Sequence, residues 1–143
     1  IRIDPATGLM VGVRITTSAG VTPVPWETLR AYEYEPGLED LPESVKNLDG
    51  KKIAMLGFLW AIYEFDDIDE FGLVGNHWSC CYGIPPGLSD VVVVTLKDDQ
   101  AGLSQTLNPI RVEGTFHVRE IMDEGFPVAI YELKNATATV LEY

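Results

Sequence analysis

The chain has 143 residues, of which 46% are hydrophobic and 22% are charged, a composition typical of one globular domain with a single buried core. Its 22 acidic and 10 basic residues give a net charge of −12, which favours cations and argues against nucleic acids and anionic membranes as partners. No apolar run approaches the roughly 20 residues that a membrane-spanning helix requires.

Residues 1–25 are rich in turn signals and predict an N-terminal linker or extension, ahead of a β-barrel domain over residues 26–143. Within the linker, residues 9–16 could form one strand. The sequence begins with Ile1 and not with Met, so we expect that a preceding segment has been removed. A signal peptide or a membrane anchor would fit, and membrane tethering through that segment is therefore an open expectation.

Two short helices are expected at the start of the domain. The first covers residues 26–32, where Glu27 suits the positive N-terminal end of a helix. The second covers residues 42–47, with Asp40 as its N-cap and Pro42 in its first turn.

Five later segments predict the main β-strands. They are residues 51–65, 70–74, 91–96, 109–118 and 128–141, the last of them broken near residues 134–135. The first segment is apolar on both faces, which predicts cover on both sides, and the fourth alternates as a half-exposed strand does. Gly57 and Gly114 lie inside long strands, where glycine permits the bends of a small closed sheet.

This pattern predicts an all-β fold with minor helix. A five-stranded Greek-key barrel of the OB type fits best, with the N-terminal extension and one or two short helices added to it. An open sandwich is the alternative architecture.

The connection between the second and third predicted strands, residues 75–90, holds both cysteines of the chain. Thiolate and imidazole groups favour zinc or copper(I), so His77, Cys80 and Cys81 are the candidate metal ligands. Adjacent cysteines are not the usual spacing of a zinc site. A fourth ligand, such as His117 or a carboxylate, would have to arrive through folding.

Other interpretations of the cysteines remain open. They could be buried as small hydrophobic residues, or form a vicinal disulfide in an oxidising compartment. One of them could also be a nucleophile with His77 as its base. The sequence shows no third residue that would orient His77, so no catalytic residue is assigned.

Trp78, Tyr82, Pro85 and Pro86 form a candidate binding platform in the same connection, because aromatic and proline side chains suit a peptide or a sugar. Loops and one open face commonly bind ligands in OB barrels. The structural alternative is a lid that closes one end of the barrel, with Trp78 in the core.

Several segments also stand in a distinctive order. They are VPWETL at residues 24–29, LDGKKI at 48–53 followed by Gly57 and Phe58, FGLV at 71–74, and VEGTF at 112–116. This order resembles the bacterial family known as domain of unknown function 3299, over roughly residues 24–143. The family is seen in exported proteins and lipoproteins. The resemblance implies an OB-like barrel in an extracytoplasmic location, either periplasmic or membrane-anchored, and it implies no activity.

The central loop of that family commonly reads Cys-x-His followed by prolines. The matching piece here is CCYGIPP at residues 80–86, in which Tyr82 stands at the histidine position. We therefore expect a non-enzymatic binding or accessory module whose loop takes a metal ion, such as zinc or copper, or a protein partner. The alternatives are a thiol- or metal-dependent enzyme using Cys80 or Cys81 with His77, and a purely structural subunit of a membrane-associated complex.

Overall fold

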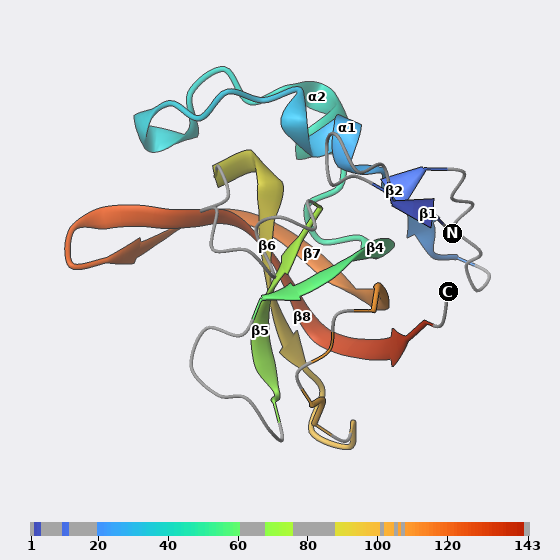
Figure 1. Cartoon of the computed structure of the whole chain (residues 1–143). Helices are drawn as coiled ribbons and strands as arrows, with labels where there is room; N and C mark the ends of the chain where they lie inside the picture. Colours follow the sequence, from blue (N-terminus) through green and yellow to red (C-terminus); the bar gives the residue numbers. More distant parts are fainter. Residues whose placement is uncertain are drawn as a thin grey trace.

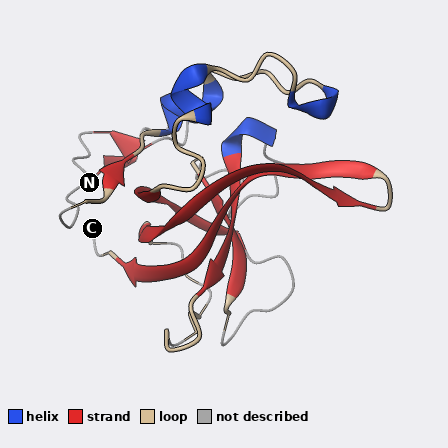
Figure 2. Ribbon diagram, turned by 180° about the vertical axis from the view of Figure 1, so that it is seen from behind, coloured by secondary structure: helices blue, strands red, loops and turns tan. Residues whose placement is uncertain are grey.

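The structure of the chain is a computed structural model that describes residues 2–3, 10–11, 20–60, 68–75, 88–100, 102–104, 106 and 108–141. Its strands are β1 (Arg2–Ile3), β2 (Met10–Val11), β3 (Thr22–Pro23), β4 (Lys52–Trp60), β5 (Glu70–Val74), β6 (Val91–Leu96), β7 (Ile110–Asp123) and β8 (Phe126–Val140). Its helices are α1 (Trp26–Arg30) and α2 (Glu43–Lys46), with short 3-10 helices η1 (Pro36–Leu38) and η2 (Leu88–Asp90). Figures 1 and 2 show both α-helices on one side of the sheet.

Six strands form one sheet in the order β3-β4-β5-β6-β8-β7, and β1 and β2 form a separate pair. Strand β7 also pairs with β4, so β4, β5, β6, β8 and β7 complete a ring of hydrogen bonds. Within the ring, β6 and β8 are parallel and the other pairs are antiparallel. The predicted β-rich fold with minor helix is confirmed.

Strand β4 makes the ring possible because it changes partner at Gly57. Residues 52–57 pair with β7, whereas residues 58–60 pair with β5. A Cβ atom at Gly57 would lie 2.8 Å from the backbone oxygen of Val74 and 2.8 Å from Cγ of Leu73. The two backbones can approach this closely only where one residue lacks a side chain.

Strand β8 is continuous through residues 134–135, so the predicted break there is wrong. The pairing of β7 with β8 instead shifts register between Glu113 and Thr115, as it does at a β-bulge. Asn135 lies at this shift with a φ of 54°, a left-handed conformation that asparagine tolerates. Strand β7 also runs beyond the predicted end at residue 118, because residues 121–123 pair with the start of β8.

The core lies where the strands of the ring face one another. Its largest cluster includes Ile53, Met55 and Leu59 of β4, Phe71 and Leu73 of β5, Val92 and Val94 of β6, Ile110, Val112 and Phe116 of β7, and Tyr131 and Leu133 of β8. Every side chain from Ile53 to Leu59 is buried, which confirms the predicted cover on both faces of β4.

Helix α1 matches its prediction closely, and α2 differs from its prediction in the cap. Pro42 occupies the N-cap of α2 with extended backbone, and its carbonyl accepts hydrogen bonds from the N–H groups of Val45 and Lys46. Asp40 lies two residues earlier with a φ of 60° and does not cap the helix. The proline sets the entry geometry, so the helix begins without a side-chain cap. No helix among the described residues is long and apolar enough to cross a membrane.

The hairpin between β7 and β8 projects from the sheet (Figure 1, orange). At its base, Glu132 is 4% exposed and is the one charged side chain that is buried among the described residues. Arg119 donates two hydrogen bonds to it, of 2.7 and 3.1 Å. Burial alone would raise the pKa of Glu132, but these hydrogen bonds and the charges of Arg119, Lys134 and His117 leave it below its ordinary range.

Replacing Gly57 with alanine is expected to lower the free energy of unfolding by about 1–3 kcal/mol, the usual cost of overpacking an interior. The nearest neighbours include a backbone oxygen that cannot rotate away. Urea denaturation followed by tryptophan fluorescence measures the change. Thr139→Ala, at an exposed position of β8, is the control and should change stability by no more than about 0.5 kcal/mol. Unchanged stability in Gly57→Ala would contradict the close approach of β4 and β5.

Glu132→Gln is expected to be less stable than the wild type at neutral pH. The folded-state pKa of Glu132 is lowered, so its charge stabilises the folded state above the ordinary glutamate pKa, and this contribution is lost as the pH falls through the folded-state value. Denaturation at several pH values should show the difference between the two proteins closing below about pH 4.

Glu43→Gln is the control for this experiment, because the side chain of Glu43 is 81% exposed on α2. Because its ion pair with Lys46 is exposed, the stability of this variant should stay within about 0.5 kcal/mol of the wild type at every pH. A difference between Glu132→Gln and the wild type that stayed constant through the acidic range would show that the carboxylate charge is not what stabilises β8.

Candidate functional site

The predicted metal ligands and binding residues all lie outside the described residues. They are His77, Trp78, Cys80, Cys81, Tyr82, Pro85 and Pro86, within residues 76–87. Both ends of this segment are described. It leaves β5 at Gly75 and returns at η2, and β5 and β6 pair up to Val74 and Val91.

The described residues that flank 76–87 on either side contact the same side chain, Arg30 of α1. At the first end, a Cβ atom on Gly75 would lie 2.8 Å from Nη2 of Arg30 and 2.7 Å from the Trp26 ring, so glycine is needed for this contact. At the second end, Nε of Arg30 donates a hydrogen bond to the carboxylate of Asp90. The base of the segment is therefore fixed against α1.

Helix α1 has five residues and is too short to be stable alone. Tertiary contacts hold it in place. The indole N–H of Trp26 donates a hydrogen bond of 2.7 Å to the backbone oxygen of Leu56. The hydroxyl of Tyr131 donates one of 3.0 Å to the backbone oxygen of Leu29. Burial raises the pKa of Tyr131 to about 12, although a hydrogen bond with Ser89 lowers it. The phenol therefore remains a hydrogen-bond donor at physiological pH.

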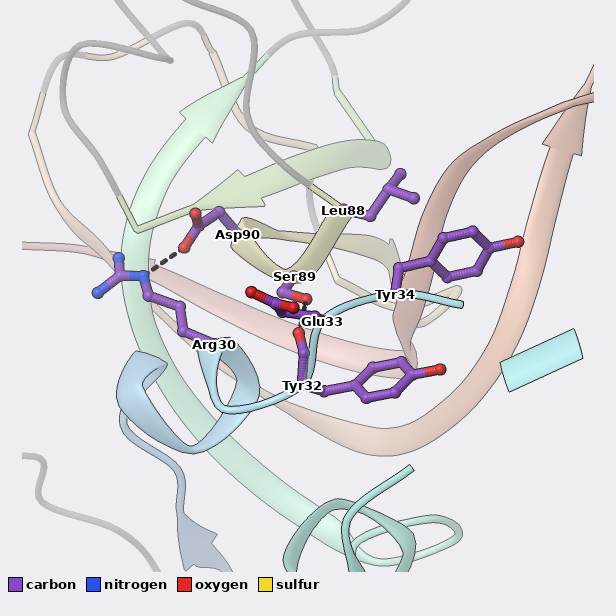
Figure 3. Close-up of a pocket in the computed structure, with 7 residues that line it drawn as sticks. All are labelled: Arg30, Tyr32, Glu33, Tyr34, Leu88, Ser89 and Asp90. Carbon is purple, nitrogen blue, oxygen red and sulfur yellow. Dashed lines mark hydrogen bonds and ion pairs between the residues drawn. The ribbon is translucent and has the colours of Figure 1, made fainter. Parts of the chain in front are cut away.

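A pocket of about 400 Å³ lies beside this base, which is within the size range of small-ligand sites (Figure 3). Its lining comes from the end of α1, the residues after it, and η2: Arg30, Tyr32, Glu33, Tyr34, Leu88, Ser89 and Asp90. The paired Arg30 and Asp90 lie on one side of the view and the two tyrosine rings on the other.

Tyr34 is held by Glu120 of β7. Its hydroxyl donates to Oε2 of Glu120 at 2.9 Å, and the backbone N–H of Gly37 donates to Oε1 at 2.6 Å. Desolvation and the adjacent Glu120 carboxylate raise the pKa of Tyr34, so this phenol is protonated at physiological pH. Glu120 thereby connects Tyr34 of the pocket lining and Gly37 of η1 to β7, at the base of the projecting hairpin.

Tyr32 is held at both its side chain and its backbone. Its hydroxyl donates to the backbone oxygen of Glu39 at 2.7 Å, and its own backbone oxygen accepts from the hydroxyl of Ser89 at 2.5 Å. These bonds connect the segment after α1 to η2, although the two are distant in sequence. Tyr32, which is 3% exposed, is therefore part of the packed support beneath the pocket, and Tyr34 is its partly exposed aromatic side chain.

Sequence reasoning missed this pocket. The alternation Tyr32-Glu33-Tyr34 directly after a helix was the available signal, since aromatic residues are enriched at binding surfaces. The other lining residues, those of η2, follow the prolines of the cysteine-containing segment in the sequence. No periodic pattern in that part of the sequence marks them. Among the described residues, no group of three His, Cys, Asp or Glu side chains is placed to hold a metal ion.

Comparison with known proteins bears on the family and the fold. A family model described as "Protein of unknown function (DUF3299)" matches residues 34–140. Among solved structures, the chain is similar to a DUF3299 family protein from Pseudomonas aeruginosa PAO1, with a TM-score of 0.61 and 21% sequence identity. That similarity covers 86% of this chain and 97% of the other, and it shows a shared fold.

No curated protein matches this chain significantly. The family match, however, covers most of the domain and confirms the resemblance found in the sequence. The chain belongs to the DUF3299 family of proteins of unknown function.

Proposed function

We propose that this chain is an extracytoplasmic, non-enzymatic binding module whose ligand is a protein partner. The site consists of the pocket together with the adjoining segment 76–87. The observation that carries this proposal is that Gly75 and Asp90, which flank the segment, both contact Arg30 at the edge of a pocket of about 400 Å³. A concave site of this size, with an aromatic side chain and convergent polar and charged groups, is suited to a specific ligand.

We further propose that the ring is a barrel of the OB type. If β4 is taken as the first strand, the ring runs first, second, third, fifth, fourth and back to the first, with the third and fifth strands parallel. Ligands of OB folds commonly lie on the face of the second and third strands. These strands are β5 and β6, and segment 76–87 connects them, which supports placing the site there.

The chemistry of the pocket favours binding over catalysis. A serine nucleophile needs an adjacent general base, and the hydroxyl of Ser89 donates instead to the backbone oxygen of Tyr32. The raised pKa of Tyr34 keeps its phenol protonated, so it cannot act as a base at physiological pH. A thiol enzyme that uses Cys80 or Cys81 with His77 remains the enzymatic alternative.

The proposed extracytoplasmic location is supported by the resemblance to a family seen in exported proteins and lipoproteins. In an oxidising compartment, Cys80 and Cys81 could also form a vicinal disulfide, which would stiffen the segment. A purely structural subunit of a membrane-associated complex is the alternative that shares this location, and it would use the same surface for docking.

A photo-crosslinking amino acid introduced at Glu33 is expected to give one discrete product with a partner protein in intact cells. Glu33 is exposed and lines the pocket, so a bound partner must lie within reach of it. The same substitution at Thr139, an exposed position outside the pocket lining, is the control and should not give that product. No product from position 33, or the same product from both positions, would contradict binding at this site.

A metal ion is the second candidate ligand, favoured by the presence of His77, Cys80 and Cys81 within a five-residue stretch. On this hypothesis, protein purified without chelator carries one zinc or copper ion per chain, and Cys80→Ser and Cys81→Ser each lose it. Elemental analysis and thiol alkylation with and without chelator measure this. Metal-free protein whose thiols alkylate equally under both conditions would contradict the metal hypothesis and leave the protein-partner proposal intact.

A further inference from the structure

We propose that the pocket receives a cationic side chain, arginine in preference to lysine, from a basic segment of the protein partner. This inference rests on the proposed function, because it names the chemistry that the same site recognises. It follows from the ion pair, the unpaired carboxylate and the anchored tyrosines of the pocket lining.

The one basic residue of the lining is already occupied. Arg30 donates to the carboxylate of Asp90, and its guanidinium carbon lies 6.0 Å from the centroid of the Trp26 ring. These contacts satisfy its charge and fix its orientation, since a guanidinium stacks on an aromatic ring and pairs with a carboxylate at the same time. An anionic ligand would have to compete with Asp90 for Arg30, so the pocket does not favour anions.

The remaining charges at the pocket are negative. Glu33 lines the pocket, is exposed, and has no ion-pair partner among the described residues. Behind Tyr34, both carboxylate oxygens of Glu120 accept hydrogen bonds from neutral donors, so no cation among the described residues neutralises Glu120. A cation entering the pocket therefore meets one available carboxylate directly and a second one behind the aromatic wall.

The partly exposed Tyr34 ring suits a guanidinium group. The rings of Tyr32 and Tyr34 extend in the same direction from the chain (Figure 3), and each hydroxyl is anchored by a hydrogen bond to an acceptor outside the lining. Tyr32 is only 3% exposed and supports the pocket from within the core, so the partly exposed Tyr34 ring is the one that a ligand can reach. Ring faces attract cations, and arginine also stacks flat on them. Because the phenols are already anchored, little side-chain entropy is lost when a ligand binds.

Charge complementarity decides between the possible occupants. The chain carries a net charge of −12, which speeds the approach of a basic segment and slows that of any anion. A second copy of the chain carries the same charge and is repelled, as is an anionic membrane surface. A basic peptide segment of another protein is the occupant that all three observations favour.

The test is a titration of the nitrogen-15-labelled full chain with acetyl-Gly-Arg-Gly-amide, followed by NMR. We expect saturable shifts that are confined to the resonances of residues 30–34 and 88–90. Acetyl-Gly-Glu-Gly-amide should give none. Glu33→Gln should weaken binding of the arginine peptide about five-fold, as expected when a partly exposed ion pair is lost.

Glu43→Gln is the matched control, since it removes the same charge from an exposed position on α2 outside the lining, and it should leave the affinity unchanged. Tyr34→Phe keeps the ring and should keep most of the affinity, whereas Tyr34→Ala should lose it. The dispersion of each spectrum reports whether the variant is folded.

Equal weakening by Glu33→Gln and Glu43→Gln would overturn the inference, because binding would then be general attraction to an acidic surface. So would binding of the glutamate peptide, or the absence of localised shifts. A discrete crosslinked partner at position 33 together with no binding of the arginine peptide would leave the proposed function standing and refute only the cationic ligand.

Discussion

At Gly57, strand β4 leaves β7 and joins β5, and a methyl group at this position would collide with a backbone oxygen. This steric constraint allows one strand to serve two neighbours and so to complete the ring of hydrogen bonds. The ring in turn lets every strand in it turn buried side chains toward a shared core. The edge strand β3 and the helices are added to this framework, and their positions follow from it.

The pocket is formed by elements that are added to the ring of strands: the end of α1, the residues after it, and η2. Helix α1 cannot persist alone, and it is placed by bonds from Trp26 to β4 and from Tyr131 of β8 to α1. Its last residue, Arg30, then contacts Gly75 and Asp90, which flank segment 76–87. The chain after α1 continues past η2, where Tyr32 and Tyr34 line the pocket. The geometry of the site therefore depends on strands that contribute nothing to its lining.

The strands could be predicted from the sequence wherever burial imposes a pattern. Strand β4 is apolar on both faces because both of its faces are covered. In the first half of β7, apolar and polar residues alternate because only one face of the strand is covered. The second half of β7 could not be predicted, since residues 117–122 are partly buried or exposed with no alternation between the two faces, and backbone pairing with β8 defines the strand there. The break expected near Asn135 was wrong because a left-handed residue and a bulge let the strand continue.

The site was less predictable than the fold for a physical reason. Its decisive contacts join residues far apart in sequence, such as Arg30 with Asp90 and Tyr32 with Ser89, and no local periodicity encodes them. Composition did draw attention to the cysteine-containing segment next to this pocket. The roles assigned to His77, Cys80 and Cys81 stay predictions, because residues 76–87 lie outside the described part of the chain.

The closed ring also sets the order in which the protein can be assembled. Strand β4 must find β7 more than 50 positions later in the sequence, and β6 has no parallel neighbour until β8 has been made. Such distant pairings carry a large loop-closure entropy, and folds dominated by them mature in roughly milliseconds to seconds. During synthesis, the emerging chain would expose half-paired strands until its last long strand left the ribosome. A chain built this way stays open to capture by chaperones, and to aggregation, for longer than a helical domain of equal length.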